Sequence, residues 1–372
     1  MRKKFIYPAL IALIAVAAFQ ACKKSGTSPN NSSTGFDRVG MLKNLSTNII
    51  VPGYVSFQAS VVSLDSSITA FNASPDITKL SSLQASFKIA YERWQGVSTF
   101  DFGPATNENL RISLNTFPAD VTQINTNVNS GSYNLAALSA LPAEGFPAID
   151  YLLFGTGADN NAILVQYTTD SQAANRKAYL TAVSAIIKTK TNNVVSAWKT
   201  TYPATFLAAS GTDVGSSVGQ LTNELNEDFE VIKNYEIGIP AGTESMGTTF
   251  PTKVQAYYSG ISLQLTLLHL QAIQNIYLGQ SAAGNGLGFD DYLISVKAAY
   301  NGGSLNDAIT TQFATATTKL QALSDPLSNQ ITSNLTGVTA AYSALQLQTV
   351  LLKTDMPSAL GILITYGDTD GD

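Results

Sequence analysis

The chain is poor in the side chains that many enzymes use to bind metals and move protons. Its 372 residues include one cysteine, Cys22, and one histidine, His269. Zinc sites of the His-Glu-x-x-His kind need two histidines and are therefore excluded. A serine triad would have to use His269, which falls within an amphipathic helical pattern, and the sequence has no Gly-x-Ser-x-Gly elbow. A histidine in such a place is typically a packed or surface residue, so we assign no catalytic residue.

Charge is also scarce, especially positive charge. Charged residues make up 13% of the chain, the formal net charge is −5, and no basic cluster occurs. Proteins that bind nucleic acid usually carry basic patches, so we expect no nucleic-acid partner. The sequence lacks a P-loop, and the glycines at positions 284, 286 and 288 follow no strand, so no cofactor-binding residue is assigned. Hydrophobic residues make up 45% of the chain, which predicts a folded protein.

A single long apolar run, Phe5 to Phe19, lies near the N-terminus. It is shorter than the ~20 residues that a transmembrane helix needs. Basic residues at positions 2 to 4 precede it, and Ala21 and Cys22 follow it. This layout predicts a bacterial lipoprotein signal over residues 1–21, with a lipid on Cys22; an ordinary secretory signal is the alternative.

The predicted cleavage has consequences for the mature protein. Loss of three basic residues would lower the formal charge from −5 to −8. Residues 22–40 are polar and rich in serine and asparagine, which predicts a flexible tether. The residue after Cys22 is lysine, not aspartate, which favours the outer membrane. We therefore expect an envelope protein anchored to the outer membrane by its N-terminal lipid, on the periplasmic or the surface face.

Apolar residues recur at spacings of three and four over most of the remaining chain, a pattern that predicts helices. The predicted helices are 80–97, 179–198, 221–235, 254–278, 306–323 and 335–353. We find no convincing strand pattern. The fold class is therefore all-α, with two antiparallel helical bundles over residues 41–205 and 206–372. The seam between the bundles is expected near residues 201–219.

Two groups of carboxylates could in principle bind a hard metal ion. Glu224, Glu227, Asp228 and Glu230 fall on one predicted helix, and we interpret them as a solvated acidic face. Aspartates at positions 368, 370 and 372 alternate like the start of a calcium loop. The later ligands of such a loop do not follow, so a solvated tail is the preferred interpretation.

The stretch G-F-P-A-I-D-Y-L-L-F-G, from Gly145 to Gly155, resembles the signature of the imelysin-like family, also called peptidase family M75. That signature is G-x-H-x-x-E followed by an apolar helix and a glycine. Other stretches support the resemblance in the same order, and together they extend it over residues 45–372. They are residues 91–104, 114–120, 233–240 and 253–262, the stretch G-L-G-F-D-D-Y-L, and the C-terminal segment.

The resemblance implies a fold of two α-helical bundles, an envelope location and a link to iron-regulated uptake. The family is also classified as a peptidase family, so the resemblance implies a possible peptidase activity. The motif itself is altered, because Pro147 stands at the histidine position and Asp150 at the glutamate position. Proline has no group that could bind a metal or carry a proton. Ser98 lies where relatives are expected to carry an acid.

The altered motif still fits local structure. Gly145 is a permissive start, and Pro147 falls in the first helical turn, where a missing N–H costs little. Ile149, Leu152 and Leu153 can then face a core. The favoured interpretation is a packing segment that has lost its main ligand, and the alternative is an altered site in which Asp150 binds a metal.

Three hypotheses for function remain open. The first is a lipid-anchored, non-catalytic binding component in iron or haem acquisition, with an envelope protein, a metal or haem as its partner. The second is a metallopeptidase of family M75, which would need zinc and several protein ligands. The third is a carboxylate-based metal carrier that uses Asp150 and prefers hard ions such as Fe³⁺ or Ca²⁺. The candidate ions are therefore iron, calcium and zinc.

Overall fold

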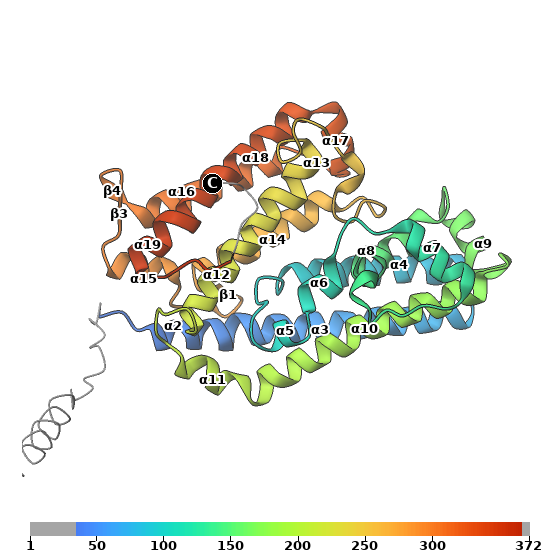
Figure 1. Cartoon of the computed structure of the whole chain (residues 1–372), viewed down its shortest axis with the longest axis horizontal. Helices are drawn as coiled ribbons and strands as arrows, with labels where there is room; N and C mark the ends of the chain where they lie inside the picture. Colours follow the sequence, from blue (N-terminus) through green and yellow to red (C-terminus); the bar gives the residue numbers. More distant parts are fainter. Residues whose placement is uncertain (1–34, 367–372) are drawn as a thin grey trace, which may run out of the picture. The chain divides into compact units, whose positions relative to one another are not determined.

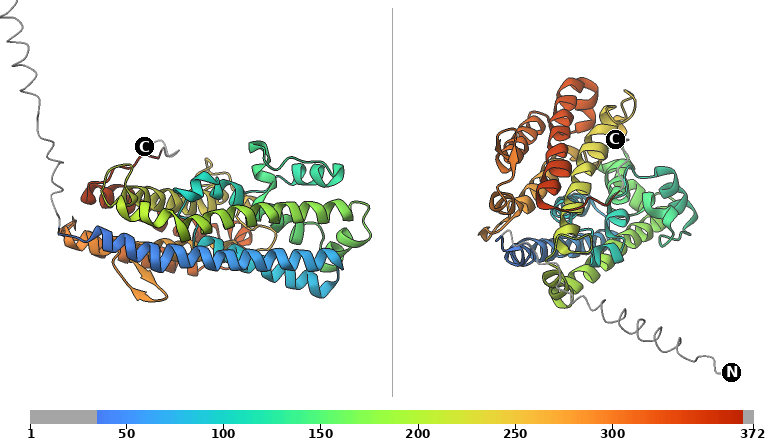
Figure 2. Two further views of the ribbon diagram at one scale, coloured as in Figure 1. Left: turned by 90° about the horizontal axis from the view of Figure 1, so that it is seen from below. Right: turned by 60° about the vertical axis from the view of Figure 1, so that its left-hand side comes forward.

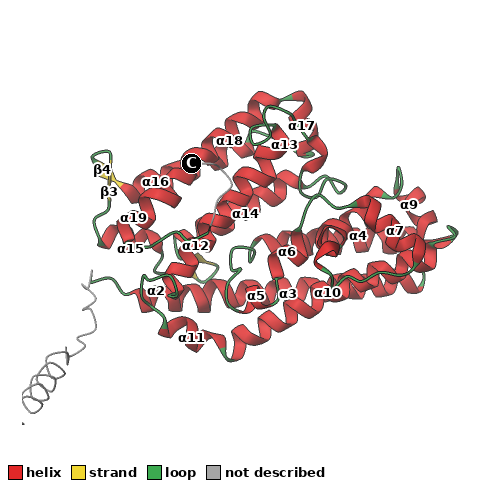
Figure 3. Cartoon of the chain, in the orientation of Figure 1, coloured by secondary structure: helices red, strands yellow, loops and turns green. Residues whose placement is uncertain are grey.

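Helices account for most of residues 35–366, the part of the chain that the computed structural model describes (Figures 1 and 3). Within these residues the strands are two short hairpins, β1 (Gln280–Ser281) with β2 (Gly284–Asn285) and β3 (Ala299–Tyr300) with β4 (Gly303–Ser304). The predicted all-α class is confirmed. The predicted signal over 1–21, Cys22 and the aspartates at 368, 370 and 372 lie outside the described residues.

The first half of the described chain builds one group of helices. It contains α2 (Arg38–Asn44), η1 (Leu45–Ile50), α3 (Val51–Ala73), α4 (Ile77–Gln95), α5 (Pro104–Asn107), α6 (Leu110–Asn115), α7 (Val121–Ser130), η2 (Leu138–Ala143), α8 (Gly145–Asp150), η3 (Tyr151–Gly155), α9 (Asn160–Thr168) and α10 (Ala173–Thr200). The long helix α3 packs along both α4 and α10 (Figure 2).

The second half builds a second group. It contains α11 (Tyr202–Ala208), α12 (Ser217–Glu230), η4 (Val231–Gly238), α13 (Ile239–Ala241), η5 (Pro251–Lys253), α14 (Ser262–Tyr277), α15 (Phe289–Ser295), α16 (Leu305–Gln321), α17 (Leu327–Ser333), α18 (Leu335–Val350), η6 (Leu351–Asp355) and α19 (Met356–Leu360). Helix α16 packs on α14 and α18, and α14 also packs on α4 of the first group. The bundle boundary predicted between residues 205 and 206 stays a prediction. The described residues from Asp37 onward form one compact unit.

Aspartate side chains start several helices of the first group. Asp37, Asp76, Asp120 and Asp159 each accept a hydrogen bond from the backbone amide three residues later. Such N-caps satisfy amides that have no partner inside the helix and are each worth about 1 kcal/mol. Four of the 26 acidic residues of the chain therefore stabilise helix starts.

Four segments of the described chain form wide π-helical turns, η1, η3, η4 and η6. Three of them, η1, η4 and η6, are each followed two residues later by a proline. These prolines are Pro52, Pro240 and Pro357. Proline lacks an N–H and its ring clashes with the carbonyl four residues earlier, so the preceding turn widens. The amides of Val51 and Ile239 accordingly reach back five residues, to Ser46 and Asn234.

The predicted helix positions are largely confirmed. The predicted helices 179–198 and 306–323 correspond to α10 and α16, and 335–353 corresponds to α18 with η6. The prediction was wrong for 254–261, which form turns before α14 begins. Three apolar residues of these patterns, Tyr235, Tyr257 and Leu268, are between 36% and 45% exposed. Turns and a wide helical segment shift the phase of the helix, which a constant spacing of three and four cannot follow. Within residues 35–366 no helix is both long enough and apolar enough to cross a membrane.

Candidate functional site

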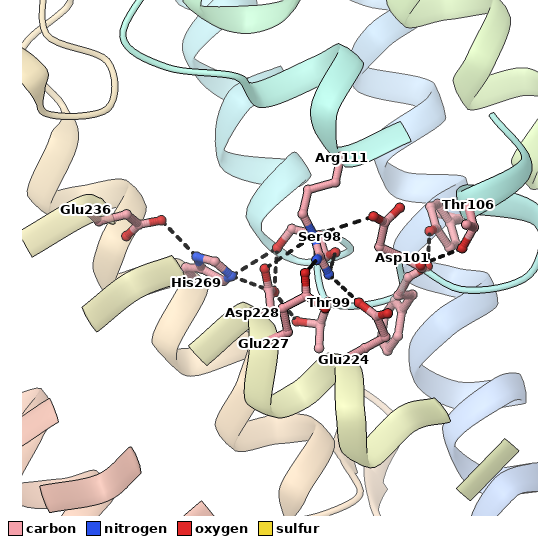
Figure 4. A network of polar contacts seen from close by, with 12 residues as sticks. Ser98, Thr99, Asp101, Thr106, Arg111, Glu224, Glu227, Asp228, Glu236 and His269 are labelled. Atoms are coloured by element: carbon pink, nitrogen blue, oxygen red, sulfur yellow. Dashed lines mark hydrogen bonds and ion pairs between the residues drawn. The ribbon is translucent and has the colours of Figure 1, made fainter. Parts of the chain in front are cut away.

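A pocket of about 250 Å³ lies where α4, the turn after it and α6 meet α12, η4 and α14. Ionisable side chains of both helix groups converge at this pocket (Figure 4). Its lining includes Trp94, Ser98, Arg111, Asp228, Tyr235 and His269. These residues are far apart in the sequence, so the fold brings the site together.

His269 is buried and lies between two carboxylates. Its Nε2 is 2.7 Å from Asp228 Oδ2, and its Nδ1 is 2.9 Å from Glu236 Oε1. Both carboxylates come from the continuous α12–η4 helix, and its wide turn brings them to opposite edges of the imidazole ring (Figure 4). Burial lowers the pKa of His269, but the two carboxylates outweigh burial and raise its pKa to about 10. The ring is therefore an imidazolium that donates from both nitrogens at neutral pH.

Asp228 gathers several donors in addition to His269. Its Oδ2 accepts hydrogen bonds from Ser98 Oγ at 3.0 Å and from Thr99 Oγ1 at 2.7 Å. Burial raises the pKa of this carboxyl, but His269 and Arg111 outweigh it and hold its pKa well below its usual range. Asp228 is therefore ionised at neutral pH although it is only 1% exposed.

Arg111, on α6, is the second cation of the site, and 14% of its side chain is exposed. Its Nη2 is 2.6 Å from Glu224 Oε2 and its Nη1 is 3.3 Å from Glu227 Oε1. Its Nε lies 3.8 Å from carboxylate oxygens of both Asp101 and Asp228. Burial lowers the pKa of Arg111, but these four carboxylates outweigh burial and raise it. Burial raises the pKa of Glu224 to about 8, although Arg111 acts in the opposite direction.

The predicted solvated acidic face on α12 was wrong. Asp228 and Glu230 are buried and Glu224 is largely covered, while Glu227 keeps 43% of its side chain exposed. The reason is that this face of α12 packs against other helices, and two cations supply the counter-charges: Arg111 from α6 of the first group and His269 from α14 of the second group. Glu230 pairs instead with Lys353 at 2.8 Å. A sequence shows the carboxylates on one helix but not the distant cations that face them.

The altered motif forms α8 and η3, and it packs as predicted. Gly145 has a φ of +71°, and an added Cβ would lie 2.4 Å from the Leu114 carbonyl oxygen. Glycine is therefore required for the close approach of α8 to α6. Pro147 falls in the first turn of α8, and the neighbouring Phe146 stacks on Tyr91 with ring centroids 4.6 Å apart. Ile149, Leu152 and Leu153 are buried.

Asp150 is also buried, and backbone groups occupy both of its oxygens. Oδ2 accepts from the Tyr258 amide at 2.9 Å, and Oδ1 accepts from the Ser259 amide at 3.0 Å. Burial raises the pKa of Asp150 to about 6, and these hydrogen bonds partly oppose the rise. The carboxylate therefore ties the motif helix to the turn that precedes α14.

This geometry does not suit a metal ion at the motif. Pro147 offers no donor atom, and the Asp150 oxygens are directed at amides. Within residues 35–366 no group of three or more His, Cys, Asp and Glu side chains has an arrangement that could hold a metal. A second pocket of about 260 Å³ lies beside the motif, lined by Pro147, Asp150, Lys253 and the rings of Tyr257 and Tyr258. Phe117 lines both pockets, so they are neighbours.

Comparison with known proteins places the motif and the cluster in a family. The model of the imelysin family, peptidase M75, matches residues 50–352, which is most of the chain. The chain belongs to the imelysin family. The resemblance seen in the sequence is therefore confirmed, and the match includes Arg111, Asp150, Asp228 and His269.

Individual imelysin relatives are distant in sequence but similar along most of their length. "Iron-regulated protein A" of Synechococcus elongatus is 22% identical over 327 residues, which cover 81% of this chain and 83% of the relative. A crystal structure of a putative iron-regulated protein A precursor from Parabacteroides distasonis has a TM-score of 0.70 at 17% identity, covering 90% of this chain and 97% of that one. An imelysin-like protein from Psychrobacter arcticum has a TM-score of 0.68 at 17% identity, covering 88% and 97%.

Reasoning from the sequence found parts of the site and missed others. Ser98, Asp228 and His269 were each noticed, but nothing indicated that they lie together. Arg111 and Glu236 were missed. The only signal in the sequence was that such residues are scarce. A single histidine on an apolar helix, and an arginine in a chain with 13% charged residues, both indicate that buried partners of opposite charge should be looked for.

Proposed function

We propose that this imelysin is a lipid-anchored, non-catalytic binding component of the cell envelope that serves iron acquisition, and that its ligand enters the pocket above His269. The observation that supports the pocket is its lining, which combines the buried, ionised side chains of Asp228 and His269 with apolar side chains and the partly exposed Tyr235. Buried charges are costly unless they are paired, and they gather at binding or catalytic sites. The iron link follows from the name of the Synechococcus relative.

The state of His269 supports binding over hydrolysis. Ser98 Oγ, His269 and Glu236 have the spacing of a nucleophile, a base and an orienting acid, with contacts of 3.0 Å and 2.9 Å. However, Asp228 lies at the same nitrogen as Ser98 and favours the protonated ring. An imidazolium cannot accept the proton of a serine hydroxyl. The Ser98 hydroxyl instead donates to Asp228 and helps to satisfy it.

Growth of a deletion strain under iron limitation tests the proposal. The deletion should slow growth, and the wild-type gene should restore it. Ser98→Ala should also restore growth, because the hydroxyl is not a nucleophile. Ile112→Trp, which fills the pocket from its partly exposed wall, should fail to restore growth while the protein still accumulates.

The anchor is tested in the same strain. Cys22→Ser should move the protein from the membrane fraction to the soluble fraction and weaken complementation. Two results would contradict the proposal. Failure of Ser98→Ala to restore growth would point to catalysis, and full restoration of growth by Ile112→Trp would show that the pocket is not needed for the function.

A further inference from the structure

A third pocket, of about 300 Å³, lies where η4 and the loop after α13 meet α18 and η6. It shares no described lining residue with the pocket above His269. Its described lining is mostly polar and includes two lysines, Lys233 and Lys353, one carboxylate, Glu244, three threonines and Gln346. A polar, charged lining of this kind complements a polar, charged occupant.

The lysines outnumber the carboxylates in this lining. Two lysines and one glutamate give the described lining residues a formal charge of +1. Glu244 accepts a hydrogen bond from Tyr342, and Lys353 is partly neutralised by Glu230, which is 2.8 Å away and outside this lining. Lys233 is only 4% exposed, and a buried ammonium group is stable only where acceptors or negative charge surround it. The pocket therefore suits an occupant that carries carboxylates.

The last described residues of the chain lie beside this pocket. Asn223 on α12 holds them, because its side chain donates to the Leu363 carbonyl at 3.0 Å and accepts from the Thr365 amide at 2.6 Å. The ring centroid of Tyr366 then lies 5.6 Å from Lys353 Nζ, within the range of a cation–π contact. Lys353 lines the pocket, so the described part of the chain ends within reach of it.

The residues that follow, 367–372, lie outside the described residues and have the acidic sequence G-D-T-D-G-D. Six residues can span up to about 20 Å, enough to reach both lysines of a pocket that lies beside Tyr366. Each aspartate can accept a charge-assisted hydrogen bond from an ammonium group. The segment is attached next to the pocket, so its effective concentration there exceeds that of a free anion of similar chemistry.

We propose that the acidic segment 367–372 binds this pocket, with its aspartates at Lys233 and Lys353. Lys233 belongs to η4, the wide turn that also carries Glu236 to His269. The bound segment therefore fastens itself to the turn that shapes the candidate site. The inference does not rest on the proposed function, because it concerns a different pocket and a contact within the chain.

Carbodiimide cross-linking tests this contact, since the reagent joins a carboxylate to an amine only where the two groups touch. The full chain in detergent should give cross-links from 367–372 to Lys233 or Lys353, identified by mass spectrometry after digestion. Lys319, an exposed lysine on α16 outside the pocket, should give none to this segment. Added sodium chloride should lower the yield, because salt screens contacts between charged groups near the surface.

Two matched variants change one charge without altering the segment or the lysines. Glu244→Gln removes the carboxylate of the lining and keeps an oxygen that can accept from Tyr342. It should raise the yield at Lys233 about twofold, measured at a salt concentration that lowers the wild-type yield. A gain is not expected from a misfolded variant. Glu92→Gln removes a carboxylate outside the pocket and should leave the yield unchanged.

The proposal fails on any of four results. The first is the absence of cross-links from 367–372 to both pocket lysines while other lysines react. The second is cross-linking to Lys319 in similar yield, which would show that the segment does not select the pocket. The third is a yield that Glu244→Gln leaves unchanged. The fourth is a yield that inorganic phosphate abolishes while sodium chloride of equal ionic strength does not, which would assign the pocket to a free anion.

Discussion

The motif segment and the charged cluster of this imelysin differ in how recognisable they are from sequence and in what their side chains do. The motif segment, Gly145 to Gly155, is recognisable from its sequence, yet its single acidic side chain, Asp150, accepts hydrogen bonds from two backbone amides. The charged cluster around Arg111 and His269 matches no motif, yet it holds seven ionisable groups beside a pocket. A family motif can therefore persist as packing while the chemistry of the site lies elsewhere.

The two regions should respond differently to loss of a side chain, and the largest effect should come from Arg111. Arg111→Met leaves up to four carboxylates without their shared cation, and breaking a buried ion pair from one side typically costs about 3–5 kcal/mol. Chemical denaturation of the variant should show a loss of this size. Adding Glu227→Gln should recover part of it, since one carboxylate that has lost its cation is removed. A loss below about 1 kcal/mol would contradict the idea that Arg111 holds the cluster together.

In the motif segment the largest effect should come from backbone geometry. Gly145→Ala places a Cβ 2.4 Å from a carbonyl oxygen at a φ of +71°, and we expect a loss of about 3 kcal/mol in the free energy of unfolding. Gly302→Ala is the matched control, because its φ is +81° but nothing lies within 4 Å of the added atom. The control should lose about 1 kcal/mol. Equal losses would show that close packing of α8 on α6 is not the reason for the glycine.

The pH dependence of stability should also separate the regions. Burial raises the folded pKa of Asp150 from 3.8 to about 6, so its contribution to stability is complete below about pH 4 and falls as the pH rises to 6. The cost of Asp150→Asn should therefore shrink over this interval, by up to about 3 kcal/mol, and stay constant above pH 7. The folded pKa of His269 is raised from 6.5 to about 10, so its contribution to stability is complete below about pH 6.5 and is lost as the pH rises to 10. Unfolding midpoints at a series of pH values check both intervals.

The smallest effect should be on metal affinity at the motif. Titration of the full chain with Fe³⁺, Zn²⁺ and Ca²⁺ should give the same result for the wild type and for Asp150→Ala, because the Asp150 oxygens are directed at amides. Stoichiometric binding that disappears in Asp150→Ala would restore the altered motif as a metal site.

Local patterns in the sequence predicted much of the fold and little of the site. The spacing of Leu80, Phe87 and Trp94 revealed a helix because each residue reports on its own face of that helix. Gly145 and Pro147 were explained by the local conformations that they permit. The burial of Asp228 could not be predicted in this way, since it depends on Arg111 and His269, which are distant in the chain. Burial and pairing are properties of the folded arrangement, so an acidic run on one helix cannot distinguish a solvated face from a site.

The state of His269 tests the central claim most directly, because the claim is that this residue is a fixed cation in the floor of a binding pocket. His269 is the only histidine, so the nitrogen signals of an isotope-labelled full chain with a histidine-free affinity tag are unambiguous. We predict that both imidazole nitrogens stay protonated from pH 6 to pH 9, consistent with a pKa of about 10. A ring that loses a proton near its ordinary pKa would contradict this claim and would make Ser98, His269 and Glu236 a candidate hydrolytic triad.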